Sequence, residues 1–149
     1  MATKIFVNLP VKDLQKSMDF FSRLGYTFNK QFTNEKAACM VISEDIYAML
    51  LTEPFFKGFI PGKEITDASK TKEVIVCLSA DSKEAVNELA DNAIAAGGKQ
   101  FRQPEDHGFM FGRSFEDLDG HVWEVMWMDP AAVIPQAEAA PAAAEVETI

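Results

Sequence analysis

Apolar and polar residues alternate along the first stretch of the chain, KIFVNL, with the period of two that is typical of a β-strand. After it, Asp13 is a favourable N-cap for a helix in LQKSMDFFSRL, whose apolar residues fall on one face, and Gly25 ends this helix. Further strands are predicted at about 26–32, 37–43 and 46–52.

The second half of the chain repeats this order of elements. EVIVCLS predicts a strand, and Asp81 with Glu84 three residues later predicts a capping box at the start of a helix in SKEAVNELADNAIAA. Gly97 and Gly98 end that helix. Three more strands are predicted near 99–102, 108–115 and 121–128.

Two other segments lack this pattern. The linker between the halves, residues 53–72, is long and contains Phe55, Phe56 and Phe59, which suit either a pocket lid or a patch for a partner chain. Residues 131–149 are rich in Ala, Pro and Glu and have almost nothing to bury, so we expect a disordered tail.

The duplicated strand–helix–three-strand pattern resembles the vicinal oxygen chelate superfamily, which includes glyoxalase I, extradiol dioxygenases, fosfomycin-resistance proteins and bleomycin-binding proteins. The stretches that carry the resemblance are FVNLPVKDLQKSMDFFSRLGY, VIVCLSADSKEAVNELADNAIAAGG and FEDLDGHVWEVMW, the last with Leu118 where Pro is usual. The resemblance implies an α+β fold in which two βαβββ modules, at about 4–52 and 73–128, form a curved mixed sheet around a cavity. The glyoxalase-like domain would then span residues 1–130, and a homodimer is implied as well.

Glu124 lies in the middle of the apolar strand VWEVMWM. The alternation of a strand puts Glu124 and Met126 on one side, and Trp123 and Trp127 on the other. In the superfamily one side of each sheet packs against helices and the other lines the cavity. The resemblance therefore implies that Glu124 is a pocket residue, and it is the residue expected to act in any catalysis.

In metal-using members of the superfamily this Glu is one of four ligands, each on a different strand. The resemblance places the other three positions on Phe6, Leu50 and Ile75, which are hydrocarbon. One carboxylate does not hold a zinc ion, which takes three or four N, O or S ligands. We therefore expect no metal and no cofactor.

A shift of the register by two residues would offer Asn8, Cys77 and Glu73, a mixed and poor ligand set. His107, in the loop PEDHGF, leaves a rearranged metal site open, and a general base or a solvated loop histidine are the other interpretations. His121 lies on the helix-facing side by parity, which favours a packing or surface role.

The remaining polar residues each have a structural alternative. Asn8 either orients a ligand or satisfies backbone groups. Arg113 reaches a substrate carboxylate, pairs with Glu124, or is a surface or dimer-contact residue. The residues expected to line the ligand cavity are Phe6, Asn8, Leu50, Ile75, Cys77, Arg113 and Met126.

Composition narrows the function further. A net charge of −9 argues against nucleic acid and against an anionic membrane surface as partners. No signal peptide or membrane-spanning run is apparent, so a cytoplasmic protein is expected. Cys39 and Cys77 lie in apolar runs, which is typical of buried free thiols.

Three functions remain open. The first is a small-molecule-binding protein without a metal, with an apolar cavity in which Asn8 and Glu124 orient a cationic or hydrogen-bond-donating ligand. The alternative is a glyoxalase-like lyase or isomerase, or a dioxygenase, that uses Glu124 as base or metal ligand. A scaffold protein is the third, based on the acidic tail and the Phe-rich linker.

Overall fold

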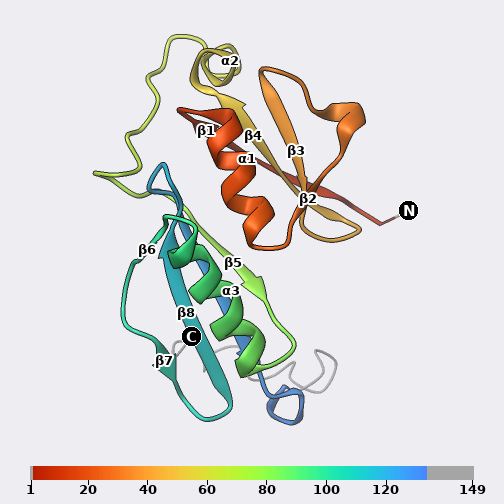
Figure 1. Ribbon diagram of the computed structural model, residues 1–149, viewed down its shortest axis with the longest axis vertical. Coiled ribbons are helices and arrows are strands. Elements are labelled where there is room, and N and C mark those ends of the chain that lie inside the picture. Colours follow the sequence, from red (N-terminus) through yellow and green to blue (C-terminus); the bar gives the residue numbers. More distant parts are fainter. Residues whose placement is uncertain (1, 134–149) are drawn as a thin grey trace, which may run out of the picture.

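The first module is a four-stranded sheet with one long helix on it. The computed structural model describes residues 2–133 of the chain (Figure 1). The sheet order is β1-β4-β3-β2, with β1 parallel to β4 and the other pairs antiparallel. Its elements are β1 (Ile5–Val11), α1 (Leu14–Arg23), β2 (Thr27–Phe28), the 3-10 helix η1 (Lys30–Phe32), β3 (Ala37–Val41) and β4 (Ile46–Thr52).

The second module repeats this arrangement in the sheet order β5-β9-β8-β6, with the short β7 also paired to β8. A short helix α2 (Glu53–Lys57) begins the linker between the modules, where a loop was expected. The remaining elements are β5 (Ile75–Ser79), α3 (Lys83–Ala95), β6 (Lys99–Gln100), β7 (Glu105–Asp106), β8 (Met110–Glu116), β9 (Val122–Met128) and the 3-10 helix η2 (Pro130–Ala132). The α+β duplication expected from the sequence is confirmed.

The two long helices begin at side-chain caps. Asp13 accepts a hydrogen bond from Lys16 N at 3.0 Å, as predicted. In the second module the cap is Ser82, whose Oγ accepts from Ala85 N at 3.0 Å. The predicted capping box of Asp81 and Glu84 is wrong by one residue. Ser82, not Asp81, has the extended backbone of an N-cap, and its side chain binds the backbone N–H of Ala85.

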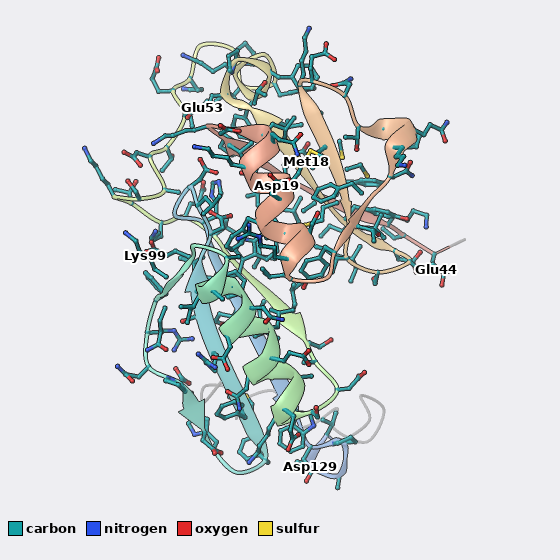
Figure 2. All side chains as sticks on the ribbon, in the orientation of Figure 1. Met18, Asp19, Glu44, Glu53, Lys99 and Asp129 are labelled. Atoms are coloured by element: carbon teal, nitrogen blue, oxygen red, sulfur yellow. The ribbon has the colours of Figure 1, made fainter. Side chains whose placement is uncertain are left out.

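One hydrophobic core joins the two modules. Both α1 and α3 lie on the same side of the sheets (Figure 1). Phe20 and Phe21 of α1 meet Phe115 of β8 and Trp123 of β9 within one buried cluster. Replacing a buried aromatic of this kind by Ala costs about 3–5 kcal/mol. On the surface of α1, Met18 packs against this core whereas Asp19 is exposed (Figure 2).

The acidic turn Asp117–His121 connects β8 to β9. Asp117 is buried and accepts hydrogen bonds from the indole Nε1 of Trp123 at 3.0 Å and from the backbone N of Asp119 and His121. Burial raises the pKa of the Asp117 carboxyl. The same three hydrogen bonds keep the turn in one conformation.

This turn also contacts the first module. Asp119 accepts from the backbone N of Lys12 at 2.9 Å and from the hydroxyl of Ser17. His121 donates through Nε2 to the carbonyl of Pro10 at 2.7 Å, so the structural role expected for this histidine is confirmed. The turn therefore fixes the end of β1 against the start of β9.

The described residues stop before most of the C-terminal tail. The disorder expected for residues 131–149 concerns mainly residues 134–149, which lie outside the described part of the chain. Within residues 2–133, no helix has the length and apolar character needed to cross a bilayer.

Candidate functional site

Glu124 lies on the face of the second sheet that points away from α3. This face, together with the face of the first sheet that points away from α1, is called here the open face. In the strand register Glu124 is opposite Cys77 on β5 and Ser114 on β8, so their side chains share this face. The Glu124 side chain keeps 21% of its surface exposed. The parity argument from the sequence is confirmed for Glu124, and Met126 follows it on the same strand and face.

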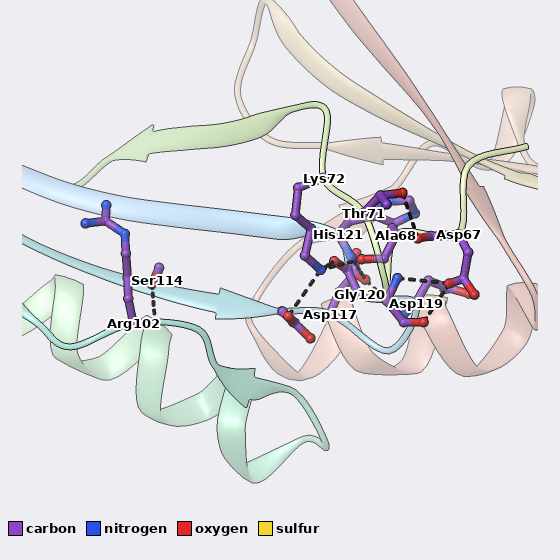
Figure 3. Close-up of polar contacts among 12 residues, drawn as sticks. Asp67, Ala68, Thr71, Lys72, Arg102, Ser114, Asp117, Asp119, Gly120 and His121 are labelled. Atoms are coloured by element: carbon purple, nitrogen blue, oxygen red, sulfur yellow. Dashed lines mark hydrogen bonds and ion pairs between the residues drawn. The ribbon is translucent and has the colours of Figure 1, made fainter.

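The partner of Glu124 is Arg102, which the sequence analysis did not identify. Arg102 follows β6, and its backbone N donates to Ser114 Oγ at 3.1 Å (Figure 3). Its guanidinium forms ion pairs with both Glu124 and Glu105. The hydrogen bond with Glu124, and then that with Glu105, raises the pKa of Arg102, and the hydrogen bond from Arg102 lowers the pKa of Glu105.

These groups line a pocket of about 280 Å³, called here the Glu124 pocket. Met110 and Met126 provide apolar, adaptable wall, and Gly112 leaves room because it has no side chain. His107, in the turn between β7 and β8, is exposed, and its Nε2 lies 3.5 Å from Oε2 of Glu105. The pocket is lined by Arg102, Gln103, Glu105, Met110, Gly112, Arg113, Ser114, Glu124, Val125 and Met126.

Arg113 does not pair with Glu124, contrary to one of the expectations. It is opposite Val125 in the register and therefore belongs to the helix-facing side of the sheet. Its Nη1 donates to Asn87 at 3.1 Å and to Asp91 at 2.8 Å, both on α3. Arg113 thus holds α3 on the sheet, and only 11% of its side chain is exposed.

Leu50 does not line the Glu124 pocket, whereas Arg113 does. It is fully buried and packs in the shared core under the helices. The residues of β4 on the open face are its neighbours Met49 and Leu51, which are opposite Asn8 and Pro10 of β1. The expected position was therefore wrong by one residue, which in a strand means the opposite face.

The other predicted cavity residues lie on the open face. Phe6 is half exposed and stacks on Tyr47 at 4.8 Å between ring centroids. Ile75 is also about half exposed. Cys77 is exposed, so the buried thiol expected there is wrong, whereas Cys39 is buried as expected.

The single cavity expected from the sequence is divided into two pockets. Asn8 and Glu73 line a different pocket, of about 300 Å³, next to the linker. The side chain of Asn8 donates to the carbonyl of Phe6 at 3.2 Å, which fits its structural alternative. Asn8 and Glu124 therefore do not face a common space in this chain.

The residues present do not fit the metal ion that the superfamily's four-ligand arrangement would hold. Around Glu124 the nearest side chains are the thiol of Cys77, the hydroxyl of Ser114 and the guanidinium of Arg102, which has no lone pair to give to a metal ion. Within residues 2–133, no three His, Cys, Asp or Glu side chains lie close enough together to hold a metal ion. Neither His107 nor Glu73 completes such a group.

The first module matches a known family. Residues 3–43 match the family described as bleomycin resistance protein-like N-terminal. Among curated proteins, none matches this chain.

Several solved structures share the fold. A hypothetical protein from S. aureus is 26% identical, with a TM-score of 0.70 over 85% of this chain and 95% of its own. A glyoxalase/bleomycin resistance protein/dioxygenase family enzyme from Burkholderia phytofirmans PsJN is 16% identical, with a TM-score of 0.73 over 85% and 99%. The fosfomycin resistance protein FosX from Listeria monocytogenes is 16% identical, with a TM-score of 0.62 over 93% and 98%.

Proposed function

We propose that this chain, which has the fold of the vicinal oxygen chelate superfamily and a bleomycin-resistance-like first module, binds a small cationic molecule in the Glu124 pocket. The resemblance read from the sequence is confirmed at the level of this superfamily. The fold alone does not select a ligand, so the proposal rests on the pocket itself.

The observation that carries the proposal is an excess of negative charge in a partly apolar pocket. Two carboxylates, Glu105 and Glu124, share the guanidinium of Arg102. The other lining cation, Arg113, is paired with Asp91 on α3, outside the pocket, so one net negative charge remains. Arg102 contacts Glu124 through Oε2, and the other oxygen, Oε1, has no hydrogen-bond partner within residues 2–133. An ammonium or guanidinium group of a ligand would complete this arrangement, while Met110 and Met126 contact its apolar part.

The same geometry gives no particular support to Glu124 as the base of a lyase or isomerase. A general base must lie within hydrogen-bond reach of the proton that it takes. Arg102 holds Oε2 of Glu124, so only Oε1 is available for that role, and the same oxygen is available to a cationic ligand. The donor set around Glu124 also gives no support to a dioxygenase. We therefore propose binding as the function and derive no reaction step.

The test is a thermal-shift panel of small amines and guanidines, with carboxylic acids and neutral amides of similar size as comparison. We expect the cations to raise the melting temperature and the acids to leave it unchanged. Glu124→Gln keeps the shape of the side chain and removes its charge. The hydrogen bond between the ligand and the charged carboxylate is then lost, and such a bond contributes about 1.5–3 kcal/mol. Affinity for the best cation should therefore fall by roughly 10- to 100-fold.

Glu88→Gln is the matched control, because Glu88 lies exposed on α3 and makes the same change of charge far from the pocket. Its affinity should equal that of the unmodified protein. If Glu124→Gln binds cations as well as the unmodified protein does, or if only acids bind, the proposal is wrong. If it instead lowers the melting temperature of the empty protein with no change in affinity, the role of Glu124 is structural.

A further inference from the structure

The linker is held firmly against the acidic turn, although the two are about fifty residues apart in the sequence. Lys72 donates through Nζ to the carbonyl oxygens of Ala68 and Gly120 and pairs with Glu116 at 3.1 Å (Figure 3). These bonds join linker residues 68–72 to the last residue of β8, Glu116, and to Gly120 of the acidic turn. We call this the linker–turn contact.

The linker–turn contact is also close-packed. A Cβ atom added at Gly120 would lie 2.8 Å from both the Cα and the N of Ser69, so the two backbones touch where only glycine fits. On the linker side, Asp67 accepts from the backbone N and the hydroxyl of Ser69 and from the backbone N of Lys70. The segment is therefore a fixed wall, because its own turn and its contact with Gly120 both restrain it.

This wall closes the pocket of about 300 Å³ next to the linker, called here the linker pocket. Its sides come from three parts of the chain: the end of β1, residues 56–74, and the start of β9. Apolar side chains form much of it, and the amide of Asn8 and the imidazole of His121 add polar groups. The apolar members are Leu9, Pro10, Phe56, Ile60, Ile65, Ala68, Val74 and Val122.

We propose that the linker pocket is a second ligand site, for an uncharged and mainly apolar molecule of about two rings with one hydrogen-bonding group. The size follows from the volume, since an apolar cavity of about 150 Å³ holds one benzene ring. The absence of charge on the ligand follows from the lining, in which two lysines, Lys63 and Lys72, balance two glutamates, Glu64 and Glu73. The Glu124 pocket differs, because Arg113 is neutralised by Asp91 on α3 and Arg102 alone faces the two carboxylates of Glu105 and Glu124.

The preformed wall matters for affinity. A site that is already ordered does not lose further conformational entropy when the ligand binds, which is the usual cost for a loop that closes over its ligand. This site does not depend on the proposed function of Glu124, because no residue lines both pockets.

The experiment is a titration of the ¹⁵N-labelled full chain with 2-naphthol, which has two rings and one hydroxyl, followed by amide chemical shifts. We expect shifts to cluster at Ile65, Thr71 and Val122, and not at Gly112 or Met126. No saturable shifts, or shifts confined to Gly112 and Met126, would overturn the proposal.

Two variants fill the linker pocket at exposed positions. Val74→Trp and Thr71→Trp each add a large side chain to a residue that lines only this pocket. Each should weaken 2-naphthol binding at least tenfold while the rest of the spectrum stays folded. Gly112→Val fills the Glu124 pocket, where an added Cβ meets its nearest neighbour at 3.6 Å, and should change the affinity less than twofold. Equal affinity in all three variants would refute the assignment.

Discussion

Gly120→Ala tests the linker–turn contact directly. Gly120 has φ +88°, a left-handed conformation that an L side chain adopts at a cost, and its new Cβ would meet the backbone of Ser69 at 2.8 Å. Gly62→Ala is the matched control, because Gly62 has φ +79° and nothing within 4 Å of an added Cβ. Both variants carry the conformational cost, and only Gly120→Ala carries the clash.

The two costs have known sizes. The left-handed conformation costs a non-glycine residue about 1–2 kcal/mol. Overpacking against atoms that cannot move aside adds about 1–3 kcal/mol. We therefore expect Gly62→Ala to lower the free energy of unfolding by about 1–2 kcal/mol and Gly120→Ala by about 2–5 kcal/mol. At roughly 3 °C per kcal/mol for a chain of this size, the melting temperatures fall by about 3–6 °C and 6–15 °C.

Urea unfolding followed by tryptophan fluorescence measures both free energies. The difference between the two variants isolates the contact between Gly120 and Ser69. Equal losses for Gly120→Ala and Gly62→Ala would refute the reasoning, because the clash would then cost nothing. Gly120→Ala should also weaken 2-naphthol binding, since the wall of the linker pocket must shift.

Four other outcomes follow from the structure. The hydrogen bond from Arg102 lowers the folded-state pKa of Glu105, so the contribution of this pair to stability is present at pH 7 and is lost as pH falls through that lowered pKa. The melting temperatures of the protein and of Glu105→Gln should therefore differ at pH 7 and converge in acid, as Glu105 becomes protonated. Burial and then the charge of Glu124 raise the pKa of the Cys77 thiol, so site-resolved alkylation of Cys77 at pH 8 should be slow and should speed up in Glu124→Gln. Elemental analysis after dialysis against chelator should find no stoichiometric Zn, Ni, Fe or Mn, and one tightly bound equivalent would contradict this. Light scattering at micromolar concentration should give a dimer mass, because Phe59 is 65% exposed and, among the strands of residues 2–133, β1 and β5 lie at sheet edges. A monomer mass would contradict this prediction.

Strand alternation was a reliable guide only where the two faces differ in polarity. In VWEVMWM a single acid among apolar residues marks the open face, and Glu124 was placed correctly. In YAMLLT both faces are apolar, because Leu50 packs under the helices while Met49 and Leu51 face away from them. The alternation carries no information in such a strand, so the resemblance alone set the register and missed by one residue.

Charged residues were harder to place than apolar ones. Arg113 lies on the helix-facing side because Asn87 and Asp91 on α3 satisfy it, and nothing near Arg113 in the sequence indicates these partners. Arg102 reaches Glu124 only because the segment after β6 folds over the open face. Contacts of this kind depend on how loops return to a sheet, which local patterns do not record.

The turn at Asp119 and His121 also has a consequence for how the chain folds during synthesis. Its bonds to Lys12 and Pro10 join residues 107 and 111 positions apart, so the backbone N–H of Lys12 finds its partner only when the turn before the last strand is made. Loop closure over such a separation is slow, and the early module meanwhile exposes the apolar surface of Phe20 and Phe21. The end of β1 thus stays without these partners until the acidic turn has been made, and a nascent chain stopped before the turn should need a chaperone to stay in solution.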